Sequence, residues 1–398
     1  MNILFLSLAN ISTIIERGIY QDLLREFIKN NHNIYIVSPT EKRYGEKTKI
    51  IEDGECKILK VRTGNIQKTN LIEKGISTLR IESQVISAIK KYYSDIKFDL
   101  ILYATPPITF VKVIKYIKLK HNAKAYLLLK DIFPQNAVDL GLFSNKGLIY
   151  KYFRAKEKKL YQLSDYIGCM SQANVDYILK HNLSLGKKVH VSPNSIEPTK
   201  ITIDKSAKDE IRQKYNIPLE IKVFIYGGNL GKPQDIPFII ECLKQNNKND
   251  RYFVICGTGT DYYKIDNYIK ADNTNNIKLI SGLPKADYDE LISCCDIGLI
   301  FLDKRFTIPN FPSRLLSYME NNMPVIACTD INTDIGKVIC EGDFGWWCES
   351  DNSNKFTDII DNISNEDIDT KGKSAKVYLE ENYTVEKSYD IIIKKLGI

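Results

Sequence analysis

The chain has few of the residues and patterns that mark metal sites, disulfide frameworks or membrane spans. Its 398 residues include four histidines, none in an HExxH motif or a Cys/His cluster, which argues against a histidine-rich metal site. The nine cysteines are scattered without a CxxC pair, so buried reduced thiols are expected. No apolar run reaches the ~18 residues of a membrane-spanning helix. The amino terminus, MNILFLSLANISTI, lacks the basic leader and cleavage site of a secretory signal, and a cytoplasmic protein is expected.

The net charge of +7 is divided unevenly along the chain. Residues 1–195 contain 31 Lys and Arg against 17 Asp and Glu, a net charge of +14, whereas the remainder contains 25 against 32, a net charge of −7. A basic half and an acidic half indicate different partners. A nucleic-acid binder would use such a basic half, but no helix-turn-helix, zinc-finger or RNP motif accompanies it. We therefore expect no nucleic-acid partner.

Strand-like runs alternate with helix-length segments along the whole chain, which is typical of parallel sheets with crossover helices. A chain of 398 residues exceeds the size that one core usually serves, so two domains are expected. The alternation stops near SPNSIEPTKITIDKS, residues 192–206. The sequence predicts an α/β protein of two Rossmann-like, doubly wound domains, residues 1–194 and 195–375, and a carboxyl-terminal helix, about 376–398, that packs back on the first. Ligands are expected beyond the carboxyl ends of the strands, in a cleft between the domains.

The stretch FIYGGNLGKPQD, residues 224–235, joins a predicted strand to a predicted helix. Gly227, Gly228 and Gly231 let backbone amides approach a ligand, and Lys232 adds a positive charge near the helix amino terminus, which suits a phosphate. The alternative is an ordinary turn with a solvated lysine. The loop has neither the GxGxxG nor the GxxxxGK[ST] pattern, so a nicotinamide or P-loop site is not favoured.

Three further loops follow other predicted strands of the second domain. SGLPKADYDE places Leu283 and Pro284 before a helix, where an extended backbone can pair with a nucleobase, or where the proline merely begins the helix. In IPNFPSRLLSYMENNMPVIACTD, Ser313 and Arg314 stand at a predicted helix start, and a hydroxyl, open amides and a guanidinium together suit a diphosphate. The loop CGTGTD contributes two glycines, Gly257 and Gly259. Four such loops in one domain favour a nucleotide site.

The ordered segments GGNLGKPQ, GTGTD, SGLPKADYDELISCCDIGL and PSRLLSYMENNMPVIA resemble the carboxyl-terminal donor domain of family 4 glycosyltransferases of GT-B fold. MNILFLSLANISTIIERGIYQDLLREFIKNNHNIYIVSP, LLLKDIFPQNAVDLG and VSPNSIEP resemble the amino-terminal half of the WbuB-like branch, which acts in bacterial capsule and O-antigen assembly. The resemblance covers nearly the whole chain. It implies retaining hexosyl transfer from a nucleotide-sugar, usually a UDP-sugar, with no external cofactor and no required divalent metal.

The resemblance also implies roles for individual residues. Gly228, Asn229 and Lys232 would face the donor diphosphate from one side, and Ser313 and Arg314 from the other. Positive groups there help most in the transition state, because the leaving diphosphate gathers negative charge. The implied donor-binding set is Gly228, Asn229, Lys232, Gln234, Gly257, Gly259, Leu283, Pro284, Ser313, Arg314 and Ser317, with Leu283 meeting the base through its backbone. The implied catalytic set is Asp131, Lys232 and Arg314.

The chain departs from the family pattern at charged positions. Asn229 and Gln234 stand where many relatives carry an Arg and a Lys, and Pro309 and Ser317 replace the usual Glu-x7-Glu pair. The second of those glutamates commonly holds the ribose hydroxyls, and Ser317 offers only a shorter, neutral contact. A degenerate subunit that binds nucleotide without turnover is therefore an alternative. A nucleotide-sugar 2-epimerase of the same architecture is another, although the acceptor-type amino-terminal motifs argue against it.

On the amino-terminal side, Asp131 follows a predicted strand in KDIFP, near where many relatives place a cleft-facing His or Asp. We expect it to contact the transferred sugar or to accept a proton from the acceptor hydroxyl; a helix cap is the alternative. Asn10 and Arg17 belong to the first strand-to-helix loop, which approaches the donor in GT-B enzymes, and an ion pair of Arg17 with Glu16 or its exposure to solvent is the alternative. The implied acceptor-side set is Asn10, Arg17, Gly18 and Thr105.

Two basic segments, residues 110–124 and 146–160, interleave lysines with Ile, Leu, Tyr and Phe. Such segments can lie on an anionic bilayer, and the alternative is a surface helix with its apolar face in the core. Capsule and O-antigen acceptors are polyprenyl-diphosphate-linked saccharides. The resemblance therefore implies a protein docked on the cytoplasmic face of the plasma membrane.

Overall fold

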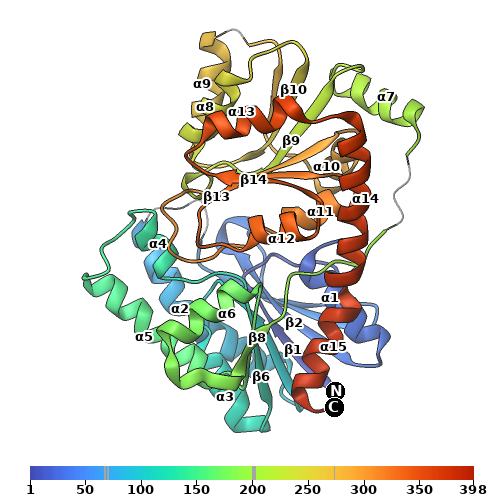
Figure 1. Cartoon of the computed structure of the whole chain (residues 1–398). Coiled ribbons are helices and arrows are strands. Elements are labelled where there is room, and N and C mark those ends of the chain that lie inside the picture. The colour runs from blue at the N-terminus through green and yellow to red at the C-terminus, as the bar shows by residue number, and fades with distance from the viewer. Residues whose placement is uncertain (67–68, 70, 200–202, 273) are drawn as a thin grey trace. The chain divides into compact units, whose positions relative to one another are not determined.

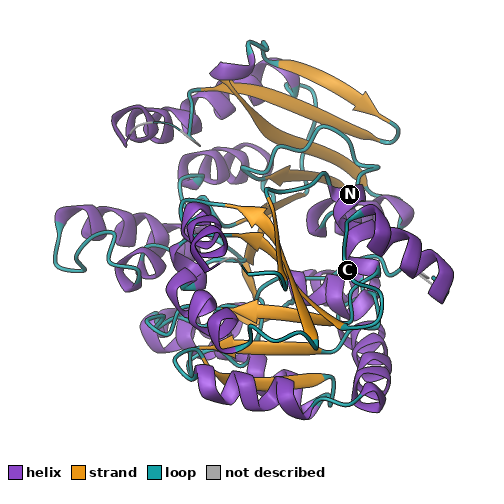
Figure 2. Ribbon diagram, turned by 90° about the horizontal axis from the view of Figure 1, so that it is seen from above, coloured by secondary structure: helices purple, strands orange, loops and turns teal. Residues whose placement is uncertain are grey.

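The computed structural model describes residues 1–66, 69, 71–199, 203–272 and 274–398, and it divides the chain into two compact units. The first unit is Met1–Ile196 together with Val385–Ile398, and the second is Glu197–Thr384. Each unit is a largely parallel sheet with helices on both faces (Figures 1 and 2). The prediction of two parallel α/β units is confirmed.

The first unit is built on an eight-stranded sheet of order β3-β4-β2-β1-β5-β6-β7-β8. Its strands are β1 (Asn2–Leu6), β2 (Asn33–Glu41), β3 (Lys49–Asp53), β4 (Cys56–Thr63), β5 (Leu100–Ala104), β6 (Lys124–Leu129), β7 (Tyr166–Cys169) and β8 (Val189–Val191). The helices are α1 (Ile19–Lys29), α2 (Leu71–Tyr92), α3 (Val111–His121), α4 (Gln135–Asp139), α5 (Leu148–Leu163), α6 (Gln172–His181) and α15 (Val385–Leu396), with short 3₁₀ turns at Lys42–Tyr44 and Leu183–Lys188.

Burial explains why the strands of this sheet are rich in apolar residues. Every residue of β5, LILYA, is buried, because helices cover both faces of a parallel sheet. The edge strand β3 differs: it runs antiparallel to β4, and none of its five residues is fully buried. The sequence analysis missed β3, since its polar, half-exposed residues carry no strong strand signal.

The chain returns to the first unit through its last helix. Val385 and Ile392 of α15 are buried in the first unit's core, and the ring of Tyr389 lies edge-on to Phe27 with centroids 4.9 Å apart. Figure 1 shows α15 beside α1, which it contacts. The returning segment begins at Val385 rather than at residue 376, because α14 (Asn365–Asn382) continues past that point and packs against α11 (Arg314–Glu320) of the second unit.

The second unit holds a six-stranded, wholly parallel sheet of order β11-β10-β9-β12-β13-β14. Its strands are β9 (Lys222–Asn229), β10 (Arg251–Thr258), β11 (Ile277–Ile280), β12 (Ile297–Phe301), β13 (Val325–Thr329) and β14 (Gly345–Glu349). The remaining helices are α7 (Lys205–Lys214), α8 (Ile236–Gln245), α9 (Tyr262–Asp272), α10 (Lys285–Ser293), α12 (Ile335–Glu341) and α13 (Ser353–Asn362), with a 3₁₀ turn at Lys232–Gln234.

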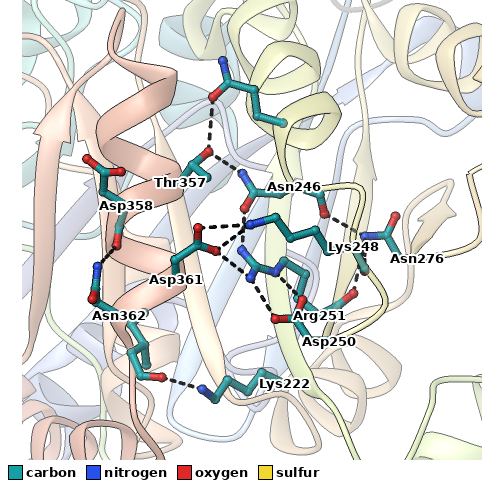
Figure 3. A network of polar contacts seen from close by, with 12 residues as sticks. Lys222, Asn246, Lys248, Asp250, Arg251, Asn276, Thr357, Asp358, Asp361 and Asn362 are labelled. Carbon is teal, nitrogen blue, oxygen red and sulfur yellow. Dashed lines mark hydrogen bonds and ion pairs between the residues drawn. The ribbon is translucent and has the colours of Figure 1, made fainter.

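A network of charged and amide side chains ties α13 to the amino ends of β9 and β10 (Figure 3). Arg251, whose side chain is 5% exposed, bonds Asp361 at 2.7 Å and Asp250 at 2.7 Å, and Lys248 reaches Asp361 at 3.0 Å. Arg251 also donates to Asn246 Oδ1 at 2.7 Å. The network lies at the end of the sheet opposite the carboxyl ends of the strands, so it stabilises the unit and leaves those ends free for a ligand.

Candidate functional site

Strand order reverses beside β9 in the second sheet, and the predicted loops meet there. β12 pairs with β9 only at Ile297↔Phe224 and Gly298↔Ile225, so the two strands separate beyond Ile225. The hydroxyl of Tyr318, from α11, enters this gap: it accepts the N–H of Gly227 at 3.3 Å and lies 3.1 Å from the carbonyl of Leu299. Such a switch point is where open parallel sheets bind ligands.

Arg314 lies at this switch point with its positive charge unneutralised. Its guanidinium carbon is 4.4 Å from the centroid of the Tyr226 ring, a cation–π contact. Within the described part of the chain it forms no ion pair, and its Nη1 is buried without a hydrogen-bond partner. Burial raises the pKa of Tyr226, an effect that Arg314 partly offsets, so this phenol is neutral at pH 7. A half-buried guanidinium with a buried, unused donor is suited to an anion.

The loop after β9 reaches the same place from the strand side. Gly228 and Asn229 are exposed, and a Cβ on Gly228 would lie 2.8 Å from Arg314 Nη2. Gly228 has φ 137°, a conformation that favours glycine. Lys232 is exposed and makes no ion pair among the residues that the structure describes. The first and fourth predicted loops are thus brought together at Gly228 and Arg314.

Asn229 and Gln234 hold that loop closed. Asn229 Nδ2 donates to Gln234 Oε1 at 2.7 Å, and Gln234 is 7% exposed. The two positions where many relatives carry positive charge are therefore occupied by a neutral, mutually bonded pair. Lys232, between them in the chain, is the charged side chain of the loop.

The glycines after β10 are explained by chain packing. A Cβ on Gly257 would lie 1.8 Å from the carbonyl oxygen of Gly228, and one on Gly259 would lie 2.1 Å from that of Leu230. Gly257 is buried, so the expected direct contact with a donor is corrected: this residue lets β10 approach the β9 loop closely. Gly259 is exposed and keeps its place in the candidate site.

The third loop lies next to the second, and Ser313 begins the fourth element as predicted. Gly282 has φ 73°, and a Cβ added to it would lie 3.0 Å from Thr258 Cγ2. Leu283 is half-buried and Pro284, just before α10, is exposed.

Ser313 is exposed at the start of α11, and its hydroxyl makes no capping hydrogen bond there. Ser317 is half-buried one turn later, and Pro309 is buried.

The sequence analysis missed three tyrosines around Arg314. Tyr226, Tyr288 and Tyr318 surround the guanidinium, and burial raises the pKa of each phenol. The hydroxyl of Tyr288 is buried without a partner and occupies the space that a side chain on Gly227 would need, 1.9 Å from its Cβ position. The sequence signal that could have indicated two of these rings is a glycine within a strand, because Gly227 leaves room for Tyr288 and Gly298 leaves room for Tyr318.

In the first unit, Asp131 follows β6 with its carboxylate bound on one side. Asn136 Nδ2 lies 2.8 Å from each carboxylate oxygen. Burial raises the pKa of Asp131 to about 6, although hydrogen bonds from Ile132 and Asn136 lower it. A carboxylate of this kind can accept a proton near neutral pH. The preceding residue, Lys130, which the sequence analysis passed over, has its pKa lowered by burial to about 7.

Thr105 supports Asp131 and does not reach the surface. It is 1% exposed, and its hydroxyl accepts the N–H groups of Lys130 at 3.1 Å and Asp131 at 3.3 Å. The same hydroxyl donates to the carbonyl of Asp131 at 3.2 Å. The expectation that Thr105 faces an acceptor is corrected: its hydroxyl is used to fix the end of β6.

The loop after β1 is held by a lysine that the sequence analysis also missed. Lys60, on β4 and 2% exposed, donates to Asn10 Oδ1, to the carbonyl of Ile11 at 3.0 Å and to Ser38 Oγ at 3.2 Å. Asn10 is exposed, and Arg17 is half-buried with contacts of its own. Gly18 donates its N–H to Asp22 at 2.9 Å, just before α1.

The structure offers little for a metal ion or a membrane span. Among the residues it describes, no group of three or more His, Cys, Asp and Glu side chains is placed to hold a metal. All nine cysteines are free, and Cys340 is the exposed one. No helix of the described ranges is both long and apolar enough to cross a membrane.

Comparisons with known proteins agree with this geometry. Residues 207–381 match the family model described as "Glycosyl transferases group 1". Over 320 residues the chain is 21% identical to the "Probable glycosyltransferase WbjE" of Pseudomonas aeruginosa, an alignment that covers 80% of this chain and 78% of that protein.

Several solved structures share the fold over the full chain length. Sucrose-phosphate synthase of Thermosynechococcus elongatus has a TM-score of 0.74 at 13% identity, covering 100% of this chain and 99% of that one. Anabaena Alr3699/HepE in complex with UDP has a TM-score of 0.69 at 15% sequence identity, and the alignment covers 100% of both chains. An E. coli structure described as trehalose-6-phosphate bound with UDP-2-fluoro glucose has a TM-score of 0.73 at 10% sequence identity. The alignment covers 100% of this chain and 99% of that one. Residues 207–381 are therefore similar to glycosyltransferase group 1 domains, and the whole chain has the GT-B fold of these solved structures.

Proposed function

We propose that the protein is a retaining glycosyltransferase that moves a hexose from a UDP-sugar to a lipid-linked saccharide in the assembly of a bacterial surface polysaccharide. The observation that carries the proposal is Arg314, a half-buried cation at the switch point of a group 1 domain. Its Nη1 is buried without a hydrogen-bond partner, and it has no carboxylate partner among the described residues. UDP and UDP-sugars are bound by the structural neighbours, which supports a uridine nucleotide as the donor.

In the proposed reaction, the second unit binds the nucleotide-sugar and stabilises its leaving group. Arg314 and Lys232 bind the diphosphate, with the hydroxyl of Ser313 and the amides near Gly228 as further donors. As the bond from the anomeric carbon to the diphosphate breaks, negative charge grows on the phosphate oxygens. Fixed cations are then worth more than in the ground state, and the barrier falls. Leu283 and Pro284 are assigned to the base, and Ser317 to the ribose.

The first unit is proposed to bind the acceptor. Asp131 contacts the transferred sugar or takes the proton of the attacking hydroxyl, which suits a carboxylate with a pKa of about 6. Asn10, Arg17 and Gly18, in the loop after β1, are assigned to the same side. The proposal places the chain in family 4, in the WbuB-like branch, without an obligatory metal, at the cytoplasmic face of the membrane.

The experiment that tests the donor assignment is thermal stabilisation by a panel of nucleotides, because a ligand that binds only the folded chain raises its Tm. We expect UDP and UDP-sugars to raise the Tm above the shift given by ADP or GDP. Lys232→Ala should reduce the shift, whereas Lys355→Ala, a change of another exposed lysine, on α13, should leave it intact. No shift with any uridine nucleotide would refute the donor assignment.

One observation favours a second candidate, a subunit that binds nucleotide without turnover. Pro309 is buried and Ser317 is half-buried at the positions where relatives carry the glutamate pair, so the site lacks those carboxylates. Such a subunit would be stabilised by UDP but would release no UDP from UDP-sugars in the presence of membrane lipid extracts. Release of UDP that depends on Arg314 would exclude it.

A further inference from the structure

The structure separates the two basic segments that the sequence analysis treated alike. Helix α3 buries Val111, Val113, Ile114 and Ile117 and exposes the single aliphatic residue Leu119, so its main apolar face lies in the core. Helix α5 differs at its amino-terminal end. Leu148 is 84% exposed, Ile149 57% and Tyr152 43%, and Leu142 in the preceding loop is 57% exposed.

These apolar side chains form one face with lysines and without exposed acids. Positions 148, 151, 152, 155, 158 and 159 of α5 are all exposed, which is the spacing of a single helix face. Within residues 141–159 the one acidic residue is Glu157, and it is 2% exposed and bonded to Arg154 and Tyr161. The α5 surface is defined as the amino-terminal part of this face, the exposed Ile149 beside it and two exposed residues of the preceding loop. Its residues are Leu142, Lys146, Leu148, Ile149, Lys151 and Tyr152.

Packing fixes the α5 surface to the turn that carries Asp131. The ring of Phe133, two residues after Asp131, lies edge-on to Phe153 with centroids 5.0 Å apart and to Phe143 at 6.3 Å. Phe153 follows Tyr152 in the chain, and Phe143 follows Leu142. Tyr150 also donates to Gln135 Oε1 at 3.3 Å. Figure 1 shows α5 at the left edge of the view, with α4 next to it along the chain.

We infer that the α5 surface docks on an anionic lipid bilayer, with its apolar side chains at the depth of the headgroups and its lysines against lipid phosphates. The inference rests on the proposed function, because docking would hold the Asp131 turn at the membrane in which a lipid-linked acceptor is embedded. A symmetric contact with a second copy fits less well, since the lysines of the two copies would face one another.

The test is flotation of the full chain with vesicles of phosphatidylcholine, with or without phosphatidylglycerol. Wild type should float with the anionic vesicles at low salt and dissociate as salt is added. Lys146→Gln with Lys151→Gln should weaken binding about 25-fold, since each lysine near an anionic surface contributes about fivefold. Leu148→Gln with Ile149→Gln should weaken it at least about tenfold, through lost apolar burial.

Leu119→Gln with Lys120→Gln is the matched control, because Leu119 is 77% exposed and stands on α3, outside the α5 surface. This variant should bind vesicles as wild type does. The inference is overturned if wild type does not bind anionic vesicles, if the control loses as much binding as the α5 variants, or if the α5 variants dissolve an oligomer of the free protein. Stabilisation by UDP is measured in parallel without vesicles. If UDP stabilises the protein but vesicles do not bind, docking alone is refuted. If vesicles bind but UDP does not stabilise the protein, the donor assignment alone is refuted.

Discussion

The guanidinium carbon of Arg314 lies 4.4 Å from the centroid of the Tyr226 ring, at a place where Gly228 has no side chain. A Cβ on residue 228 would come within 2.8 Å of Arg314 Nη2, so the glycine and the arginine are matched. The aromatic ring orients the cation without neutralising it, as a carboxylate would. The positive charge is thereby held in place for an anionic ligand, and no ion pair has to break first.

Replacing Arg314 should separate the effect of its charge from that of its shape. Arg314→Met removes both charge and donors, and we expect UDP to bind about 10- to 100-fold more weakly, the range for a lost charged hydrogen bond. Arg314→Lys keeps the charge but loses the planar stack on Tyr226, so an intermediate loss is expected. Isothermal titration with UDP measures both. Equal affinity of Arg314→Met and wild type would contradict the placement of the diphosphate.

The pairing of Gly227 with Tyr288 predicts a strongly coupled pair of mutations. A Cβ on Gly227 would lie 1.9 Å from the Tyr288 hydroxyl oxygen and 2.4 Å from its Cζ, and a ring cannot bend away as a flexible chain can. Gly227→Ala should therefore lower the free energy of unfolding by about 1–3 kcal/mol. Urea denaturation measures the change.

A second substitution in Tyr288 distinguishes steric conflict from backbone strain. In Gly227→Ala with Tyr288→Leu, the smaller side chain vacates the space, so the double variant should lose less stability than the sum of the two single variants. Gly228→Ala is a useful comparison, because its φ of 137° is unfavourable whatever its neighbours. Additive losses at Gly227 and Tyr288 would show that the ring is not the cause.

Asp131 is expected to show opposite effects on activity and stability. Burial raises its pKa to about 6 from an ordinary value of 3.8, so the folded chain takes up this proton more readily than the unfolded chain. The charged carboxylate therefore costs stability above pH 6, and the cost disappears as the pH falls towards 4. Asp131→Asn should abolish transfer at pH 7 while leaving the Tm unchanged or raised. A lowered Tm would indicate a structural role.

The same pKa sets the expected pH dependence of transfer. If Asp131 acts as a base, kcat/KM should fall about tenfold per pH unit below pH 6, as the carboxylate is protonated. Binding of UDP, which lacks the transferred sugar, should not follow this profile, because the second unit is proposed to hold the nucleotide and Asp131 belongs to the first. A kcat/KM that is flat between pH 5 and pH 7 would exclude the proton-acceptor role and leave only contact with the sugar.

The sequence was sufficient to predict the two α/β units and the loops of the second sheet, because strand periodicity and glycine positions are local features. Arg314 and Gly228 were predicted as neighbours of one ligand, and the structure brings them together. The sequence was not sufficient to predict the roles of Tyr288 and Lys60, since α10 and β4 contact their partners only through tertiary packing. Thr105 shows the opposite error. A polar residue after a strand is expected to be exposed, yet Thr105 is buried and its hydroxyl bonds the backbone at the end of β6.

Lys60 is expected to control the order of the loop after β1. It is a buried cation that donates hydrogen bonds to neutral oxygens of Asn10, Ile11, Ser12 and Ser38, and burial lowers its pKa. Lys60→Met fills a similar volume but leaves the Ile11 carbonyl without this donor, so a loss of about 1–3 kcal/mol in unfolding free energy is expected. Amide hydrogen exchange should also become faster for residues 10–14 than in wild type.

Lys57→Met is the matched control for this prediction. Lys57 lies on the same strand, but its side chain is 50% exposed and pairs with Glu52 at 3.6 Å on the surface. Exposed pairs of this kind contribute little, so its loss should leave both stability and loop exchange near wild type. If Lys60→Met accelerates exchange in α6 (Gln172–His181) as much as in residues 10–14, the lysine supports the whole unit. A change confined to the loop would instead identify Lys60 as the residue that positions Asn10, because the amide oxygen of Asn10 is held in the structure by this ammonium group.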